Sequence, residues 1–216
     1  MTDIADLELR IARLEAAREI ENLMGRFESY HAAYRNELIP AMFADRDDLI
    51  IEMPFGTYLG RDAARRVWRG ALTEDIPPTD LSGEYVEHLL TTPVIEVAKD
   101  GMTAKAAWIS PGAEAHHFGW EEGNPLKAFW YWGRYNVDFI KEDGAWKIWH
   151  LTHSATFITD YHHSYAEPEH ALSTPPAPSG RHAPDAPPRG QVPYSPTFNP
   201  GDLPVAPEPY DTYEGV

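Results

Sequence analysis

The sequence predicts an α+β fold in which helices pack on one face of a curved antiparallel sheet, followed by an extended arm. Three observations support this prediction. The first thirty residues or so carry the apolar spacing of an amphipathic helix, and residues 86–157 form long strand-like segments separated by turn signals. In addition, 13 of the 20 prolines lie between Pro168 and Pro209. Because the helices come first and the strands then follow in series, an antiparallel sheet is expected rather than alternating βαβ units.

The N-terminal helix is predicted from apolar residues that recur every three or four positions. They are Ile4, Leu7, Ile11, Leu14, Ala17, Ile20, Leu23 and Phe27. Asp3 or Thr2 is expected to cap this helix. Two shorter helices are expected at Glu37–Ala44 and Gly60–Gly70, with a strand at Leu49–Met53 between them.

Four further strands are expected to build most of the sheet. They are Val86–Val97, with a bulge at Pro93, then Thr103–Ala115, Leu126–Ile140 and Ala145–Phe157. The last two are joined by Lys141-Glu142-Asp143-Gly144, which is a strong hairpin signal.

The C-terminal region lacks apolar periodicity, and its prolines prevent helix or central strand. Composition alone is compatible with a disordered tail. However, the tail carries aromatic residues that a solvating linker does not need, namely Tyr165, Tyr194, Phe198, Tyr210 and Tyr213. We therefore predict a domain over residues 1–165 and an extended arm over 166–216 that wraps this domain or a neighbouring subunit.

Composition argues against several classes of function. The 216 residues include 34 acidic and 18 basic side chains, a formal net charge of −16, so a phosphate-binding surface for nucleic acid is not expected. The lack of cysteine excludes disulfides, thiolate catalysis and zinc–thiolate sites. Apolar runs are far shorter than the roughly 20 residues of a membrane span, and no secretory signal is evident. A cytoplasmic protein without membrane contact is expected.

Several local strings resemble the SnoaL-like branch of the NTF2-like superfamily. They are the N-terminal helix, AMFADRDDLIIEMPFG, GRDAARRVW, EHLLTTPVIEV and GRYNVDFIKEDGAWKI, which together span most of residues 5–157. The resemblance implies a cone, in which the sheet curls around an apolar pocket that the helices close. It is specific for fold and weak for function, because the superfamily holds isomerases, cyclases, dehydratases and non-enzymatic subunits.

Comparison within this superfamily disfavours one activity and favours another. At the positions where ketosteroid isomerases carry a helix tyrosine and an aspartate base, this chain has Phe27 and Met53, which cannot exchange protons. Scytalone dehydratases keep a strand histidine that matches His88, and their helix tyrosine and aspartate fall near His31 and Ala32. This resemblance implies pocket chemistry that needs no cofactor.

Strand parity predicts which side chains face the pocket, because alternate residues share a face. In Leu126–Ile140 the set containing Tyr131 and Tyr135 is the more apolar and is expected inside. Trp130 and Trp132 then face outward, and two exposed tryptophans suggest a homodimer or higher homo-oligomer formed through the outer sheet face and the arm.

The same rule places His153 and Phe157 of the last strand inside and His150 outside. The two histidines of the HLTH string therefore point to opposite faces, and the adjacent His116 and His117 are likewise not expected to converge on one ion. No metal site is predicted.

Histidines and tyrosines are the candidate catalytic groups, since histidine exchanges protons near neutral pH and tyrosine can stabilise an oxyanion. The catalytic candidates are His31, His88, Tyr135 and His153. The substrate-binding candidates are Tyr34, Phe55, Tyr58, Arg61, Tyr85, Trp108, Tyr131 and Phe157. The alternative for each is an ordinary core or surface role.

The 26 aromatic residues favour an aromatic substrate over a sugar or a phosphate. The chain is also similar to the sphingomonad diarylpropane lyases. That similarity implies a cofactor-independent lyase that converts a phenolic 1,2-diarylpropane-1,3-diol, through a quinone methide, to a stilbene and formaldehyde. Two alternatives stay open: a dehydratase, isomerase or cyclase for another polycyclic compound, and a non-catalytic small subunit of a ring-hydroxylating dioxygenase.

Overall fold

The computed structural model describes residues 3–74, 81–118, 121–167, 169 and 177–212. In chain order the elements are α1 (Ile4–Ala32), η1 (Asn36–Met42), β1 (Ile50–Met53), β2 (Gly56–Leu59), η2 (Arg65–Glu74), β3 (Tyr85–His88), β4 (Thr91–Val97), β5 (Thr103–His117), β6 (Leu126–Glu142), β7 (Ala145–Asp160), η4 (Gly180–His182) and η5 (Pro200–Asp202). The predicted α+β fold is confirmed.

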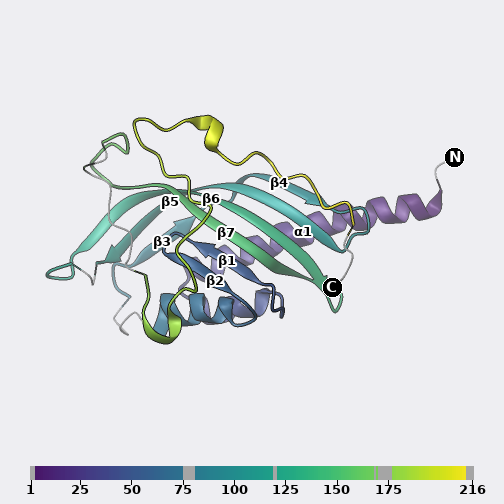
Figure 1. Ribbon diagram of the computed structural model, residues 1–216, viewed down its shortest axis with the longest axis horizontal. Helices are drawn as coiled ribbons and strands as arrows, with labels where there is room; N and C mark the ends of the chain where they lie inside the picture. Colours follow the sequence, from purple (N-terminus) through teal and green to yellow (C-terminus); the bar gives the residue numbers. More distant parts are fainter. Residues whose placement is uncertain (1–2, 75–80, 119–120, 168, 170–176, 213–216) are drawn as a thin grey trace.

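One strongly curved sheet contains all the strands, in the order β2-β1-β7-β6-β5-β3, and β4 also pairs with β5. Every pairing is antiparallel except the parallel contact between β1 and β7. The helices α1 and η2 lie on one side of the sheet, and the C-terminal arm crosses the other side (Figure 1). The sheet, α1 and η2 enclose the core, as expected for a cone.

The long hairpin of β6 and β7 forms at the predicted turn. Asp143 and Gly144 both have positive φ, at 49° and 80°, and Glu142 pairs with Ala145. This two-residue turn matches the right-handed twist of its strands. The predicted parity of β6 is also confirmed: Tyr131 and Tyr135 are buried inside, whereas Trp130 is 42% exposed on the outer face.

The predicted strand Val86–Val97 is two strands, β3 and β4, that pair with successive parts of β5. The strand is interrupted at Leu89 and Leu90, although the Leu89 N–H still donates to the Pro111 carbonyl of β5 at 2.9 Å, and Thr92 adopts a positive φ of 46°. The register then shifts between Thr91 and Val94, which confirms the predicted bulge at Pro93. Strand β2 was not expected.

The helices differ in detail from the expectation. The segment predicted at Glu37–Ala44 is a 3₁₀ helix, η1, with Pro40 inside it. Helix η2 continues to Glu74, beyond the predicted end at Gly70, and has π-type hydrogen bonds. Among the described residues, no helix is long and apolar enough to cross a membrane.

Helix α1 begins where expected, since the Asp3 carboxylate accepts a hydrogen bond from the backbone N–H of Ala5. Only its second half packs in the core, starting at Ala16. The first turns project beyond the sheet, so that Ile4 and Leu14 are each 73% exposed (Figure 1). The predicted apolar stripe therefore forms a helix, but the apolar residues before Ala16 are largely exposed and do not pack in the core.

The arm extends the sheet where β1 ends. Strand β1 pairs with β7 only as far as Thr152. Beyond that point, the Gln191 amide accepts from the N–H of Ala155 and donates to the carbonyl of His153, both at 3.2 Å. The Tyr194 N–H donates to the Thr156 carbonyl at 2.6 Å. The described part of the arm thus lies on its own chain, as one of the two predicted arrangements requires; Tyr213 is outside the described residues.

Substitution Gln191→Ala is expected to destabilise the protein. It leaves two backbone groups of β7 without these partners, at a cost of roughly 1–2 kcal/mol. Thermal unfolding measures the loss as a fall of several degrees in Tm. The control is Val205→Ala, because Val205 is 86% exposed on the same arm. Equal Tm values for the two variants would show that the arm does not hold β7.

Candidate functional site

Six titratable side chains from four elements meet between α1 and the inner face of the sheet. This inner cluster consists of Glu28 and His31 on α1, His88 on β3, Tyr131 and Tyr135 on β6, and His153 on β7. The His88 ring centroid lies 4.7 Å from that of Tyr131 and 5.3 Å from that of His153, which stacks on Tyr135 at 4.3 Å. The four predicted catalytic residues are therefore neighbours in space.

Gly133 makes room for the cluster on β6. It faces inward between Tyr131 and Tyr135, and a Cβ atom there would lie 2.7 Å from Cε1 of Tyr131 and 3.1 Å from Nε2 of His153. No side chain larger than hydrogen fits between these two rings.

Substitution Gly133→Ala is therefore expected to separate the Tyr131 and His153 rings and to destabilise the fold by about 1–3 kcal/mol. The control is Gly25→Ala, since a Cβ there meets nothing within 4 Å and alanine favours the helix by about 0.5–1 kcal/mol. Denaturant unfolding should move the two variants in opposite directions. A Gly133→Ala protein as stable as the parent would contradict this packing.

Several polar atoms of the interior are buried without a hydrogen-bond partner among the described residues. They are Oε1 of Glu28, Nδ1 of His88, Oγ of Ser110, the hydroxyl of Tyr131 and Nε2 of His153. Buried polar atoms are nearly always paired in proteins, and each unpaired one costs about 1–3 kcal/mol. A concentration of such atoms in one place is typical of a site whose partners come from a ligand.

The Glu28 carboxyl group has a pKa close to neutral pH. Burial raises its pKa to about 7, although the charge of His88 and a hydrogen bond with Tyr135 oppose that increase. A carboxyl group with this pKa can act as either a base or an acid near neutral pH.

Glu114 favours the protonated form of His88. Burial alone would lower its pKa, but Nε2 donates to Oε1 of Glu114 at 3.0 Å, and this hydrogen bond and the carboxylate charge raise the pKa overall. Its other nitrogen, Nδ1, is the unpaired one. His88 can therefore present an acidic N–H to the interior.

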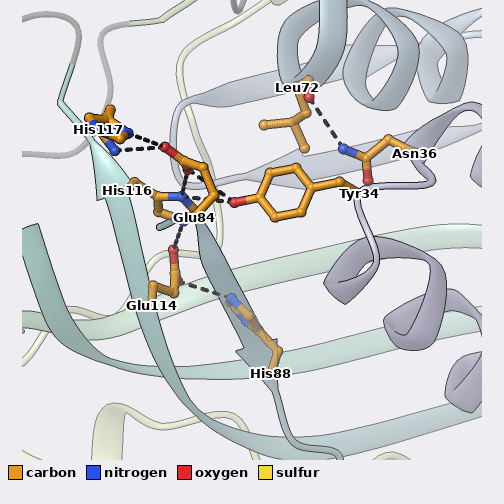
Figure 2. Close-up of polar contacts among 8 residues, drawn as sticks. All are labelled: Tyr34, Asn36, Leu72, Glu84, His88, Glu114, His116 and His117. Atoms are coloured by element: carbon orange, nitrogen blue, oxygen red, sulfur yellow. Dashed lines mark hydrogen bonds and ion pairs between the residues drawn. The ribbon is translucent and has the colours of Figure 1, made fainter. Parts of the chain in front are cut away.

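The other two imidazoles stay neutral. Burial, with the nearby charge of His88, lowers the pKa of His31 to about 4 and that of His153 well below its ordinary value. Asn36 orients the His31 ring, since its Oδ1 lies 2.9 Å from Nδ1 of His31. The Asn36 amide is itself held by donating to the Leu72 carbonyl (Figure 2). Each neutral imidazole keeps a nitrogen lone pair, and it becomes a better proton acceptor once His88 has lost its charge.

A second polar network joins the inner cluster to the protein surface (Figure 2). Glu114 contacts His88 with one oxygen and His116 with the other, at 3.0 and 2.8 Å. Nδ1 of His116 contacts Glu84 at 2.7 Å, and the Tyr34 hydroxyl donates to Glu84 at 3.1 Å.

His116 and His117 both contact one carboxylate, that of Glu84. Although adjacent, they converge on a single group, because His116 reaches Oε2 of Glu84 and His117 reaches Oε1 at 2.8 Å. Strand β5 ends at His117, and the two oxygens of a carboxylate allow both rings to reach it. Within the described ranges, no group of three or more His, Asp or Glu side chains has the arrangement of a metal site.

Three predicted substrate-binding residues lie near the site. Tyr131 belongs to the inner cluster, and Trp108 is buried on the inner face of β5 as the register partner of Tyr135. Tyr34 is directed toward Glu84 and His116. Trp108 also lines a groove of about 500 Å³ between α1 and β4, together with Arg26, Leu90 and Pro93 among other residues.

The other five predicted substrate-binding residues point elsewhere. Phe157 is on the outer face, stacked on Trp132, because a bulge between Ala155 and Phe157 reverses the strand parity. Tyr85 is 48% exposed, since the outward residues of β3 are the odd-numbered ones. Their placement in the pocket was wrong.

The remaining three residues lie in β2 or close to its ends. The Tyr58 hydroxyl donates to the His182 carbonyl of the arm, and Phe55 packs edge-on against Tyr58. Arg61 forms surface ion pairs with Asp45 and Asp47. None of these three reaches the inner cluster.

Sequence reasoning missed Glu28 and Glu114. Glu28 lies four residues after Met24 and three before His31, on the buried face of α1, so helical spacing could have identified it. Glu114 shares inward parity with Trp108, and strand parity extended along β5 would have placed it inside.

Comparison with known families agrees with this fold. The sequence profile of the SnoaL-like domain matches residues 12–152. The chain belongs to the SnoaL-like domain family. This match covers the residues of the inner cluster up to Tyr135 and leaves His153 one position beyond its end. The comparison with curated proteins gives no match.

Solved structures related to this SnoaL-like protein share its fold at low identity. A hexachlorocyclohexane dehydrochlorinase (LinA, type 2) aligns with a TM-score of 0.55 and 17% identity, over 79% of this chain and 99% of that one. A provisionally assigned scytalone dehydratase from Novosphingobium aromaticivorans aligns with a TM-score of 0.54 and 20% identity, over 72% and 93%. An NTF2-like superfamily protein from Salmonella enterica gives 0.53 and 16%, over 71% and 99%.

Proposed function

We propose that this SnoaL-like protein is a cofactor-independent lyase that acts on a phenolic 1,2-diarylpropane-1,3-diol. The observation that carries the proposal is that His88, whose pKa is raised by Glu114, and Glu28, whose pKa is raised by burial to about 7, lie in one buried cluster among unpaired polar atoms and aromatic rings. Two neighbours in fold are named for eliminations, a dehydratase and a dehydrochlorinase, which supports a lyase rather than a binding subunit.

The first step removes water from the substrate. Glu28 takes the proton of the 4-hydroxyl group, and the Tyr131 hydroxyl donates a hydrogen bond to the developing phenolate. His88 gives its Nδ1 proton to the benzylic hydroxyl, and the carbon–oxygen bond breaks. The products of this step are water and a quinone methide, which can accept an electron pair.

The second step releases formaldehyde. His31 takes the proton of the primary alcohol, and the bond between that carbon and its neighbour breaks. The electron pair restores the aromatic ring, the phenolate recovers its proton from Glu28, and a stilbene remains. Transfer of one proton from His31 to His88, whose ring centroids are 6.0 Å apart, resets the site.

The groove between α1 and β4 offers a route for the substrate. Its volume of about 500 Å³ lies in the range of small-molecule sites, and Trp108 belongs both to its lining and to the inner face of the sheet. One aryl ring would stack on Trp108 while the phenolic ring meets the inner cluster.

The test compares a diarylpropanediol that has a free 4-hydroxyl with its 4-methyl ether. The free phenol should give stilbene and formaldehyde in equal amounts, and the ether should give neither, because it cannot form the quinone methide. Water loss without formaldehyde would instead indicate a simple dehydratase. Equal turnover of the two substrates would refute the mechanism.

A further inference from the structure

Two imidazoles share the Glu114 carboxylate. Oε1 accepts from His88 at 3.0 Å, inside the inner cluster, and Oε2 contacts Nε2 of His116 at 2.8 Å (Figure 2). The Glu114 side chain is only 11% exposed, whereas that of His116 is 25% exposed. Glu114 is thus the only carboxylate placed between the acid of the proposed reaction and a group that solvent can reach, among the residues that the structure describes.

His116 is held as a cation. Each of its ring nitrogens contacts a carboxylate oxygen, Nε2 that of Glu114 and Nδ1 that of Glu84, so both nitrogens act as donors. Burial lowers the pKa of His116, but the hydrogen bonds and charges of these two carboxylates raise it overall.

Two cations that share one carboxylate weaken each other's hold on it, because like charges repel and the carboxylate charge is divided between them. We propose that His116 is a positioning residue. It shares the Glu114 carboxylate with His88, so that Glu114 stabilises the charge of His88 less and His88 releases its proton into the inner cluster more readily. Glu84 contributes indirectly, because its contact with Nδ1 of His116 keeps that ring charged. This inference rests on the proposed role of His88 as the acid.

The other titratable and charged groups around His88 and His116 come from α1, β5, β6 and β7 and from residues next to α1 and β3. Besides Glu114, the titratable groups near His88 are Glu28 and His31 on α1, Tyr131 on β6 and His153 on β7. His116 meets Glu84, the Tyr34 hydroxyl and the ring of Phe129, and its register partner is Lys127. The charge of His116 lowers the pKa of His88, which is the direction that the proposal requires.

The test is an NMR titration of the histidine rings in the ligand-free protein. In His116→Gln the amide can still donate to Glu114 but carries no charge, so the His88 titration midpoint should move to higher pH by roughly half a unit or more. Glu84→Gln should move it in the same direction, and this variant provides a second measurement if His116→Gln folds poorly. His117→Gln is the matched control, since His117 contacts Glu84 but not Glu114.

The outcomes are distinct. A midpoint that stays in place or falls in both variants overturns the inference, as does an equal shift in His117→Gln. The titration needs no substrate, so it decides the role of His116 even if no lyase activity is found. Where turnover is measured, the alkaline limb of the kcat/KM–pH profile should shift with the midpoint while KM at neutral pH stays constant, an effect that a merely structural residue would not produce.

Discussion

Substitution Glu28→Gln is expected to lower kcat/KM by about 10²–10⁴-fold, the usual contribution of a general base or acid. Because the pKa of Glu28 is raised to about 7, the acid limb of the wild-type profile should lie near pH 7 rather than near 4.5. Glutamine cannot take the phenolic proton at any pH, so this limb should disappear in the residual activity.

The same variant is expected to be more stable than the wild type above pH 7. A carboxyl group whose pKa is higher in the folded than in the unfolded protein contributes most stability below pH 4.5 and loses it as pH rises through 7. At about 1.4 kcal/mol per pKa unit, keeping Glu28 ionised costs roughly 3 kcal/mol at pH 8. Glutamine avoids much of this cost.

The matched control is Glu19→Gln, which changes an exposed carboxylate on the same helix. It should alter neither activity nor Tm. If Glu28→Gln were fully active, or less stable than the wild type at pH 8, Glu28 would be a structural residue rather than a catalytic one.

Substitution Glu114→Gln should remove the acid instead. Without the carboxylate, only the charge of Glu28 still opposes burial and the charge of His116, so the pKa of His88 should fall and less of the ring should be protonated at pH 8. The alkaline limb of kcat/KM should move to lower pH, and activity at pH 8 should fall by about 10²-fold or more. This is the opposite direction from the shift expected for His116→Gln.

Stability gives a second measurement for Glu114→Gln. Its carboxylate has a pKa lowered to about 2: burial raises it, but hydrogen bonds and charge from His116 and His88 lower it overall. The wild type therefore gains stability from Glu114 above pH 4.5 and loses it as pH falls toward 2. The variant should be less stable than the wild type at pH 6, and the difference should shrink in acid. Glu87→Gln, on the exposed face of β3, is the control.

Periodicity was enough to predict most of the fold and the inward direction of Tyr135 and His153, whereas His88 was expected inside from the resemblance to scytalone dehydratases. Those three lie on strands whose alternation is regular near them. Phe157 shows where this reasoning ends, since a bulge two residues earlier reverses parity and leaves no signal in the sequence.

The carboxylates were harder to predict than the histidines. Glu28 and Glu114 were not expected inside because isolated acidic residues are rarely buried. Helical spacing for Glu28 and strand parity for Glu114 indicate the inward direction, but the partner that makes each carboxylate favourable there, His88, lies on another element and is known only from the structure. Likewise, the contact of one Glu114 carboxylate with both His88 and His116 depends on the register of β3 against β5.

The location of a bound product tests the central claim most directly. A crystal structure with a 4-hydroxystilbene should show the phenol oxygen within hydrogen-bonding distance of Glu28 and the Tyr131 hydroxyl, with the other ring toward Trp108. Density only in the hollow lined by Arg61 and Asp45, or only on the outer sheet, would contradict the assignment of the inner cluster as the site of catalysis.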